Sequence, residues 1–111
     1  MNSARHPESS VATIRVSGDL TSTTVGPVRL ETDKLLMPDS VIAQGWTILR
    51  LDLTTAKMID SVGLNLLVSI LKRVQKRGAS MQIVCPDPNI ERTLAFTRLD
   101  QHIQLLKNDS F

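Results

Sequence analysis

A serine between an acidic residue and a glycine is the part of the sequence with the clearest chemical potential. Within residues 58–66, the order Asp60-Ser61-Val62-Gly63 stands where an apolar strand pattern gives way to a helical one. A serine in this position can cap the helix, act as a nucleophile, or present its hydroxyl to another protein. Capping alone does not explain the glycine, which costs about 1 kcal/mol relative to alanine in a helix. A missing side chain there would let another protein approach the Ser61 hydroxyl closely.

Other catalytic patterns are absent from the sequence. The five glycines are scattered rather than gathered in a phosphate-binding loop, and Ser61 does not lie in a G-x-S-x-G elbow. Nothing in the sequence pairs Ser61 with His102, so a serine hydrolase is the weakest of these interpretations. No histidine or second cysteine stands at a metal-ligand spacing from Cys85. We therefore expect no catalysis, no metal and no cofactor.

The composition fits one small soluble domain. The chain has 111 residues, of which 41% are hydrophobic and 3% aromatic, enough for one modest aliphatic core but too few rings for a base-stacking nucleic-acid module. The net charge is +2, and the densest basic run, at 72–77, suits the end of a predicted helix. We expect no nucleic-acid partner. No apolar run reaches the roughly 20 residues of a membrane span, and the polar residues 1–10 lack the apolar segment of a signal peptide. A cytoplasmic protein is expected.

Hydrophobic periodicity predicts alternating strands and helices. Strands are expected at 11–16, 47–53, 81–85 and 102–106, and helices at 23–36, at 63–77 and after Pro88, with Asp87 as the cap of the last. This order predicts an α/β sandwich, in which helices pack against one sheet. Residues 1–10 are expected to form a flexible tail, and residues 11–111 a single domain.

The helix predicted at 63–77 also indicates which residues surround Ser61 on the surface. At 100° per residue its apolar residues form one arc, and Asn65, Ser69 and Lys72 fall on the other side. Extrapolation of the helix places Ser61 above Asn65, Val68 and Lys72, so that Asn65, Ser69 and Lys72 are the outward neighbours of its hydroxyl. Leu66 lies outside the apolar arc, so it is either an exposed apolar contact or a partly covered border residue.

Several motifs, in this order and spacing, resemble STAS domains of the anti-sigma factor antagonist family. The resemblance is centred on residues 49–78 and spans about 11–106. A strand ending in D-L matches Asp52-Leu53, and the following D-S-x-G-L matches Asp60, Ser61, Val62, Gly63 and Leu64. The family's G-[DE]-L-D turn resembles Gly18-Asp19-Leu20-Thr21, with threonine for the second aspartate. Its closing L-x-x-G-L-D resembles Phe96-Thr97-Arg98-Leu99-Asp100, with Arg98 where glycine is common.

The resemblance implies a STAS-type α/β sandwich with one mixed central sheet of about four to five strands. It also implies a binding module rather than an enzyme. In the family, the serine equivalent to Ser61 is phosphorylated by a partner that is both an anti-sigma factor and a serine kinase. The unmodified antagonist binds that partner and frees the sigma factor, and a PP2C-type phosphatase restores the serine. The kinase uses ATP, so the chain itself would need no cofactor.

Motif and helix geometry together predict a partner-binding surface. Its members are Asp19, Thr21, Asp60, Ser61, Val62, Gly63, Asn65, Leu66, Ser69 and Lys72. One alternative of another class stays open: a STAS-like accessory subunit of a lipid-transport ABC system, which can share a D-[ST]-x-G-L segment and would form a constitutive complex without a kinase. Thr54 and Thr55, just upstream, also stay open as a second modified site.

Overall fold

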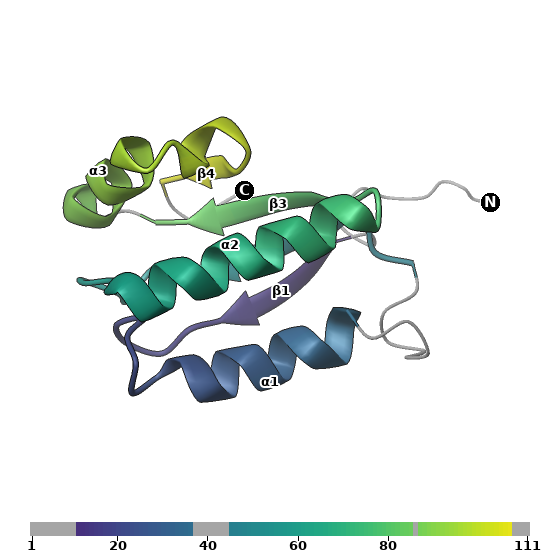
Figure 1. Ribbon diagram of the computed structural model, residues 1–111, viewed down its shortest axis with the longest axis horizontal. Coiled ribbons are helices and arrows are strands. Elements are labelled where there is room, and N and C mark those ends of the chain that lie inside the picture. Colours follow the sequence, from purple (N-terminus) through teal and green to yellow (C-terminus); the bar gives the residue numbers. More distant parts are fainter. Residues whose placement is uncertain (1–10, 37–44, 86, 108–111) are drawn as a thin grey trace.

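The computed structural model describes residues 11–36, 45–85 and 87–107 (Figure 1). The elements follow in the order β1 (Val11–Arg15), α1 (Val25–Leu36), β2 (Ile48–Asp52), α2 (Ser61–Lys76), β3 (Ser80–Val84), α3 (Pro88–Phe96), the 3-10 helix η2 (Leu99–Gln101) and β4 (Gln104–Leu106). The predicted alternation of strands and helices is therefore confirmed. The expected tail at 1–10 lies outside the described residues.

The four strands form one sheet in the order β1-β2-β3-β4, and all three pairings are parallel. The expectation of a mixed sheet is thus wrong for the described strands. The reason is that each connection between consecutive strands contains a helix, which returns the chain to the same edge before the next strand begins. The carboxyl ends of the strands consequently meet at one end of the molecule, where α1, α2 and α3 all begin (Figure 1).

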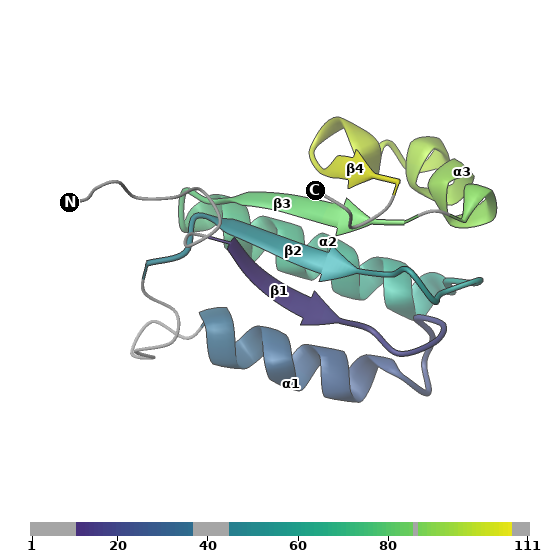
Figure 2. The ribbon, with the colours of Figure 1, turned by 180° about the vertical axis from the view of Figure 1, so that it is seen from behind.

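Helices α1 and α2 pack against the same face of the sheet, as the view from behind shows (Figure 2). The core between them is aliphatic, as the low aromatic content requires; its fully buried side chains include Leu49, Leu51, Leu67, Ile83 and Val74. Side chains alternate across a strand, so the other face carries a row in register, made of Thr13, Arg50, Gln82 and Gln104. In this row Gln82 accepts from Arg50 Nε and donates to Gln104 Oε1, both at 3.0 Å.

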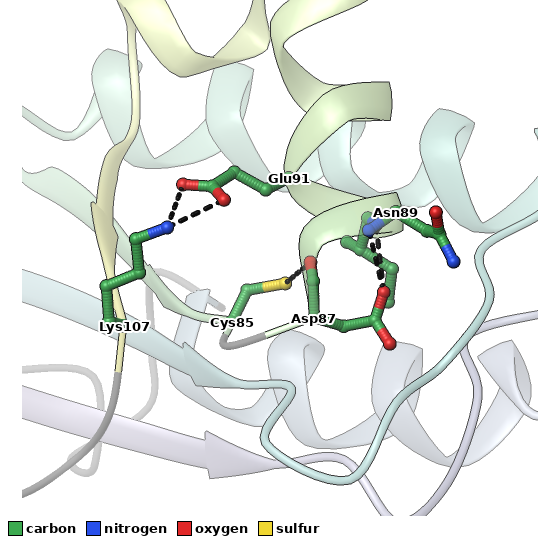
Figure 3. A network of polar contacts seen from close by, with 6 residues as sticks. Cys85, Asp87, Asn89, Glu91 and Lys107 are labelled. Carbon is green, nitrogen blue, oxygen red and sulfur yellow. Dashed lines mark hydrogen bonds and ion pairs between the residues drawn. The ribbon is translucent and has the colours of Figure 1, made fainter.

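Polar contacts tie helix α3 to the segments that precede and follow it in the chain (Figure 3). Asp87 is the N-cap, as predicted, and its Oδ1 accepts from the backbone N–H of Asn89 at 2.8 Å. Glu91 pairs with Lys107, which follows β4, through both carboxylate oxygens at 2.7 and 2.6 Å. The buried Cys85 thiol donates to the Asp87 carbonyl oxygen at 3.7 Å, and burial raises the pKa of this thiol. The side chain of Asn89 points away from the Glu91–Lys107 pair.

The start of α2 is packed tightly against the connection between β1 and α1. Leu20 and Ile59 form a parallel bridge, and the backbone N–H of Asp60 donates to the Leu20 carbonyl oxygen at 3.2 Å. A Cβ at Gly63 would overlap that same oxygen and would lie 2.9 Å from Cγ1 of Ile59. The interpretation that Gly63 leaves room for another protein is therefore wrong, because the protein's own backbone fills the space.

This contact predicts that replacing Gly63 by alanine destabilises the protein, which is the opposite of the usual effect within a helix. Helix propensity alone would make Gly63→Ala stabilising by about 1 kcal/mol, whereas overpacking against a fixed backbone costs about 1–3 kcal/mol. We expect the second effect to dominate, so the free energy of unfolding should fall. Urea denaturation of the wild type and the variant measures the difference.

Gly26→Ala is the matched control, because a Cβ at Gly26 in α1 meets no atom within 4 Å. This variant should be neutral or stabilising by up to about 1 kcal/mol. Equal stability of the two alanine variants would contradict the role assigned to Gly63.

Candidate functional site

Ser61 is the first residue of α2, and its side chain is exposed. The N-cap is Asp60, whose extended backbone precedes the helix and whose carboxylate accepts from the Gly63 N–H. Within the described residues, the Ser61 hydroxyl makes no hydrogen bond with another residue of the chain. The capping function that a serine could supply is therefore supplied by its neighbour, and the hydroxyl is left facing solvent.

The Asp60 carboxylate joins two segments that lie 38 residues apart. Its Oδ1 accepts from the Gly63 N–H and its Oδ2 from the Ser22 N–H, both at 2.9 Å. Hydrogen bonds of this kind favour the charged carboxylate, and these two, from Gly63 and then Ser22, lower the pKa of Asp60. The residue before Ser61 thus carries a negative charge that is fixed in place by backbone donors.

Asp19 makes a similar connection from the other side. Its Oδ1 accepts from the N–H groups of Lys57 at 2.8 Å and Met58 at 3.2 Å. Thr21 helps to form the turn before α1, since its N–H donates to Thr24 Oγ1 at 2.9 Å. Both predicted residues therefore shape the backbone beside Ser61.

The outer face of α2 contains most of the predicted surface. Ser61, Asn65 and Lys72 lie within about 40° of one another on the helix, opposite its buried side, and all three are exposed. The other exposed members of the predicted set are Val62 and Ser69.

Gly63 and Leu66 are buried, and Leu66 is only 3% exposed. The interpretation of Leu66 as an exposed contact is therefore wrong. The contact between Gly63 and Leu20 turns α2 so that its buried arc, about 140° wide, reaches Leu66 and leaves Leu64 and Val68 only half-buried.

Sequence reasoning missed two residues of this region, Met58 and Ser22. Met58 is 53% exposed, and together with Val62, which the predicted set included and which is 38% exposed, it places apolar side chains beside the serine. A methionine in a loop between a strand and a helix is the signal that could have indicated this. Ser22 had no signal, because it acts through its backbone N–H.

Thr54 and Thr55 are exposed, but their hydroxyl groups are engaged. Thr54 Oγ1 donates to the buried carboxylate of Asp52. Thr55 Oγ1 accepts from the Gly18 N–H at 2.9 Å and lies 3.3 Å from the Val16 carbonyl oxygen. Through these contacts both threonines support the loops around the site.

Two absences concern residues 11–36, 45–85 and 87–107, the part of the chain that the structure describes. Among them, no group of three or more histidine, cysteine or acidic side chains is placed to hold a metal ion. None of their helices combines the length and apolar character needed to cross a membrane.

The lowered pKa of Asp60 predicts a pH-dependent contribution to stability. A carboxyl group whose folded-state pKa is depressed stabilises the fold above its unfolded-state pKa, and loses this effect as the pH falls through the folded-state pKa. Asp60→Asn keeps a capping oxygen but removes the charge. The wild type should therefore melt at a higher temperature than this variant at neutral pH, and the gap should shrink in acid.

Thermal unfolding of both proteins over a pH series measures this gap. Asp60→Ala is the companion variant, since it removes the cap as well and should stay less stable than Asp60→Asn throughout. A gap that does not change with pH would contradict the electrostatic role of Asp60.

Comparison with known proteins places this geometry in a family. The STAS domain family model matches residues 4–110. A Thermotoga neapolitana protein, whose name provisionally assigns it to the anti-sigma factor antagonists, is 33% identical over 67 residues. That match covers 60% of this chain and 59% of the relative, so it spans less than two thirds of either protein.

Solved structures agree with this fold. A Thermotoga maritima protein with the same provisional designation is 25% identical, with a TM-score of 0.71 over 91% of this chain and 82% of that one. The Bacillus cell fate determinant SpoIIAA, in its phosphorylated form, is 15% identical, with a TM-score of 0.65 over 87% of this chain and 83% of that one. The chain therefore belongs to the STAS domain family.

Proposed function

We propose that this protein is an anti-sigma factor antagonist controlled by phosphorylation of Ser61. Unmodified, it binds an anti-sigma factor that is also a serine kinase; phosphorylated, it is released, until a PP2C-type phosphatase restores the serine in the cytoplasm. The observation that carries the proposal is the exposed Ser61 side chain at the start of α2, freed from capping by Asp60. The family membership and the designations of the Thermotoga relatives support it.

The start of α2 suits a phosphorylated serine. A phosphoserine carries about −1.5 to −2 charges at neutral pH, and the amino end of a helix presents the positive end of the helix dipole. The side chain faces solvent, so the added group displaces no part of the core. The fold can therefore hold the modification without unfolding.

A partner interface would respond differently to the same charge. The Asp60 carboxylate is held ionised beside Ser61 by the donors from Gly63 and Ser22, and the adjoining Met58 and Val62 are exposed apolar groups. Covering this surface would require a second, strongly hydrated anion to lose water next to a like charge. A loss of about 2.8 kcal/mol would lower affinity roughly a hundredfold. The switch can thus be local electrostatics on an unchanged fold.

The first test is the site of phosphorylation. Purified anti-sigma factors with serine kinase activity from the source organism are incubated with the protein and ATP. Intact mass and peptide mapping should show one added phosphoryl group, on Ser61, and a PP2C-type phosphatase should remove it. Ser61→Ala should stay unlabelled, while Ser69→Ala, altered at another exposed serine of α2, should be labelled. Labelling of a different residue would contradict the proposal.

The second test is the effect of charge on binding to the same kinase. Ser61→Ala should bind as the wild type does, and Ser61→Asp should bind at least about tenfold more weakly, a difference of about 1.4 kcal/mol. Isothermal titration calorimetry gives the dissociation constants. Ser80→Asp is the matched control, because Ser80 is exposed at the beginning of β3, at the other end of the sheet from Ser61. A tight complex insensitive to charge at Ser61 would favour the accessory-subunit alternative instead.

A further inference from the structure

Helix α3 is held to the rest of the protein by its buried side and by one ion pair. Ile90 and Leu94 are its buried residues, and Glu91 reaches Lys107 beside β4. Asn89, Thr93 and Phe96 fall within an arc of about 60° on a different side. Asn89 points away from the ion pair in Figure 3, and Phe96 is 88% exposed. We call the side that carries Asn89, Thr93 and Phe96 the outer face of α3.

The outer face of α3 is continuous with the segment that precedes Ser61. A hollow of about 270 Å³ lies between them, lined by Lys57, Met58 and Ile59 on one side and by Asn89, Ile90 and Thr93 on the other. Both ribbon views place α3 and the first turn of α2 at the same end of the molecule. Along α3, Phe96 lies about 10 Å beyond Asn89, at 1.5 Å per residue.

Phe96 contributes little to the core because most of its ring faces water. Single exposed aliphatic residues are common in soluble proteins, whereas aromatic residues, phenylalanine among them, are enriched in protein–protein interfaces relative to the rest of the surface. Phe96 is also one of only two phenylalanines in the chain. Phe96 lies on the same face of α3 as the hollow, and the exposed Met58 lines the other side of that hollow.

Two exposed arginines stand close to Phe96 in the sequence. Arg92 is exposed one turn before Phe96, and Arg98 is exposed two residues after it. Arg98 has a φ of 65°, a left-handed conformation that glycine adopts without strain and arginine does not. Arg98 therefore places an exposed guanidinium group two residues after Phe96, at a backbone conformation that is unfavourable for arginine.

We propose that the outer face of α3, with Phe96 as its anchor, is the second part of the docking surface for the protein that binds around Ser61. This inference rests on the function proposed above, and it commits to the same partner. The complementary patch on that partner is an apolar pocket, which receives Phe96, bordered by carboxylates that face Arg92 and Arg98. The Met58 hollow joins the two parts of the surface.

The test uses the purified kinase that labels Ser61, with Phe96→Ala set against Leu30→Ala. Leu30 is the matched control, because it is a large apolar residue, 60% exposed, on α1. Phe96→Ala should weaken binding by about tenfold or more, as anchor residues do, and Leu30→Ala by less than about twofold. Since docking away from the reacting hydroxyl is uniform binding, Phe96→Ala should raise KM for phosphorylation and leave kcat unchanged.

Arg98→Gly separates binding from folding. Glycine relieves the backbone at φ 65°, so this variant should resist urea at least as well as the wild type. It lacks the guanidinium group, so it should nevertheless bind the kinase more weakly, with a smaller dependence on salt. A merely structural role for Arg98 would instead leave affinity unchanged.

The failures of the two proposals can be told apart. If Phe96→Ala binds like the wild type while Ser61→Asp binds weakly, the α3 surface is overturned and the proposed function stands. If no kinase labels Ser61 and charge there has no effect, the proposed function fails and this inference falls with it. If sedimentation shows that Phe96→Ala disrupts self-association but partner affinity is unchanged, the face belongs to a second copy and the inference is likewise overturned.

Discussion

The close approach of the first turn of α2 to the backbone at Leu20 determines how the site is built. It requires a residue without a side chain at Gly63, and it fixes the helix relative to the connection between β1 and α1. The carboxylates of Asp60 and Asp19 reinforce the same junction by accepting backbone N–H groups across 38 and 39 residues. Because these donors are all backbone groups, the geometry around Ser61 does not depend on the side chains of Ser22, Lys57 or Met58.

Within the D-S-x-G segment, neighbouring residues have different tasks. Asp60 caps the helix, Gly63 packs against Leu20, and Ser61 and Val62 face solvent. A serine that capped its own helix would have its hydroxyl engaged by the backbone. The acidic residue before it removes that constraint, and at the same time it supplies a fixed negative charge next to the hydroxyl. The motif therefore provides both an accessible group and an environment that is sensitive to added charge.

Periodicity was sufficient to predict the elements, because local patterns determine them. The order of strands and helices, the Asp87 cap and the exposure of Asn65, Ser69 and Lys72 all follow from spacing along the chain. The role of Gly63 could not be predicted, since its contact, Leu20, lies in a distant segment. Leu66 was misplaced for the same reason: the contact made by Gly63 sets the rotation of α2. Which residues bind a partner stays a prediction, since exposure permits contact but does not prove it.

The packing at the end of β3 also has a chemical consequence for the protein's single cysteine. The nucleophilic form of cysteine is the thiolate, and burial of Cys85 disfavours that form. Oxidants and alkylating agents should therefore find little to react with while α3 and β4 stay in place. Cys85 is the only cysteine in the sequence and it is buried, so two folded copies of the chain expose no thiol through which a disulfide could join them.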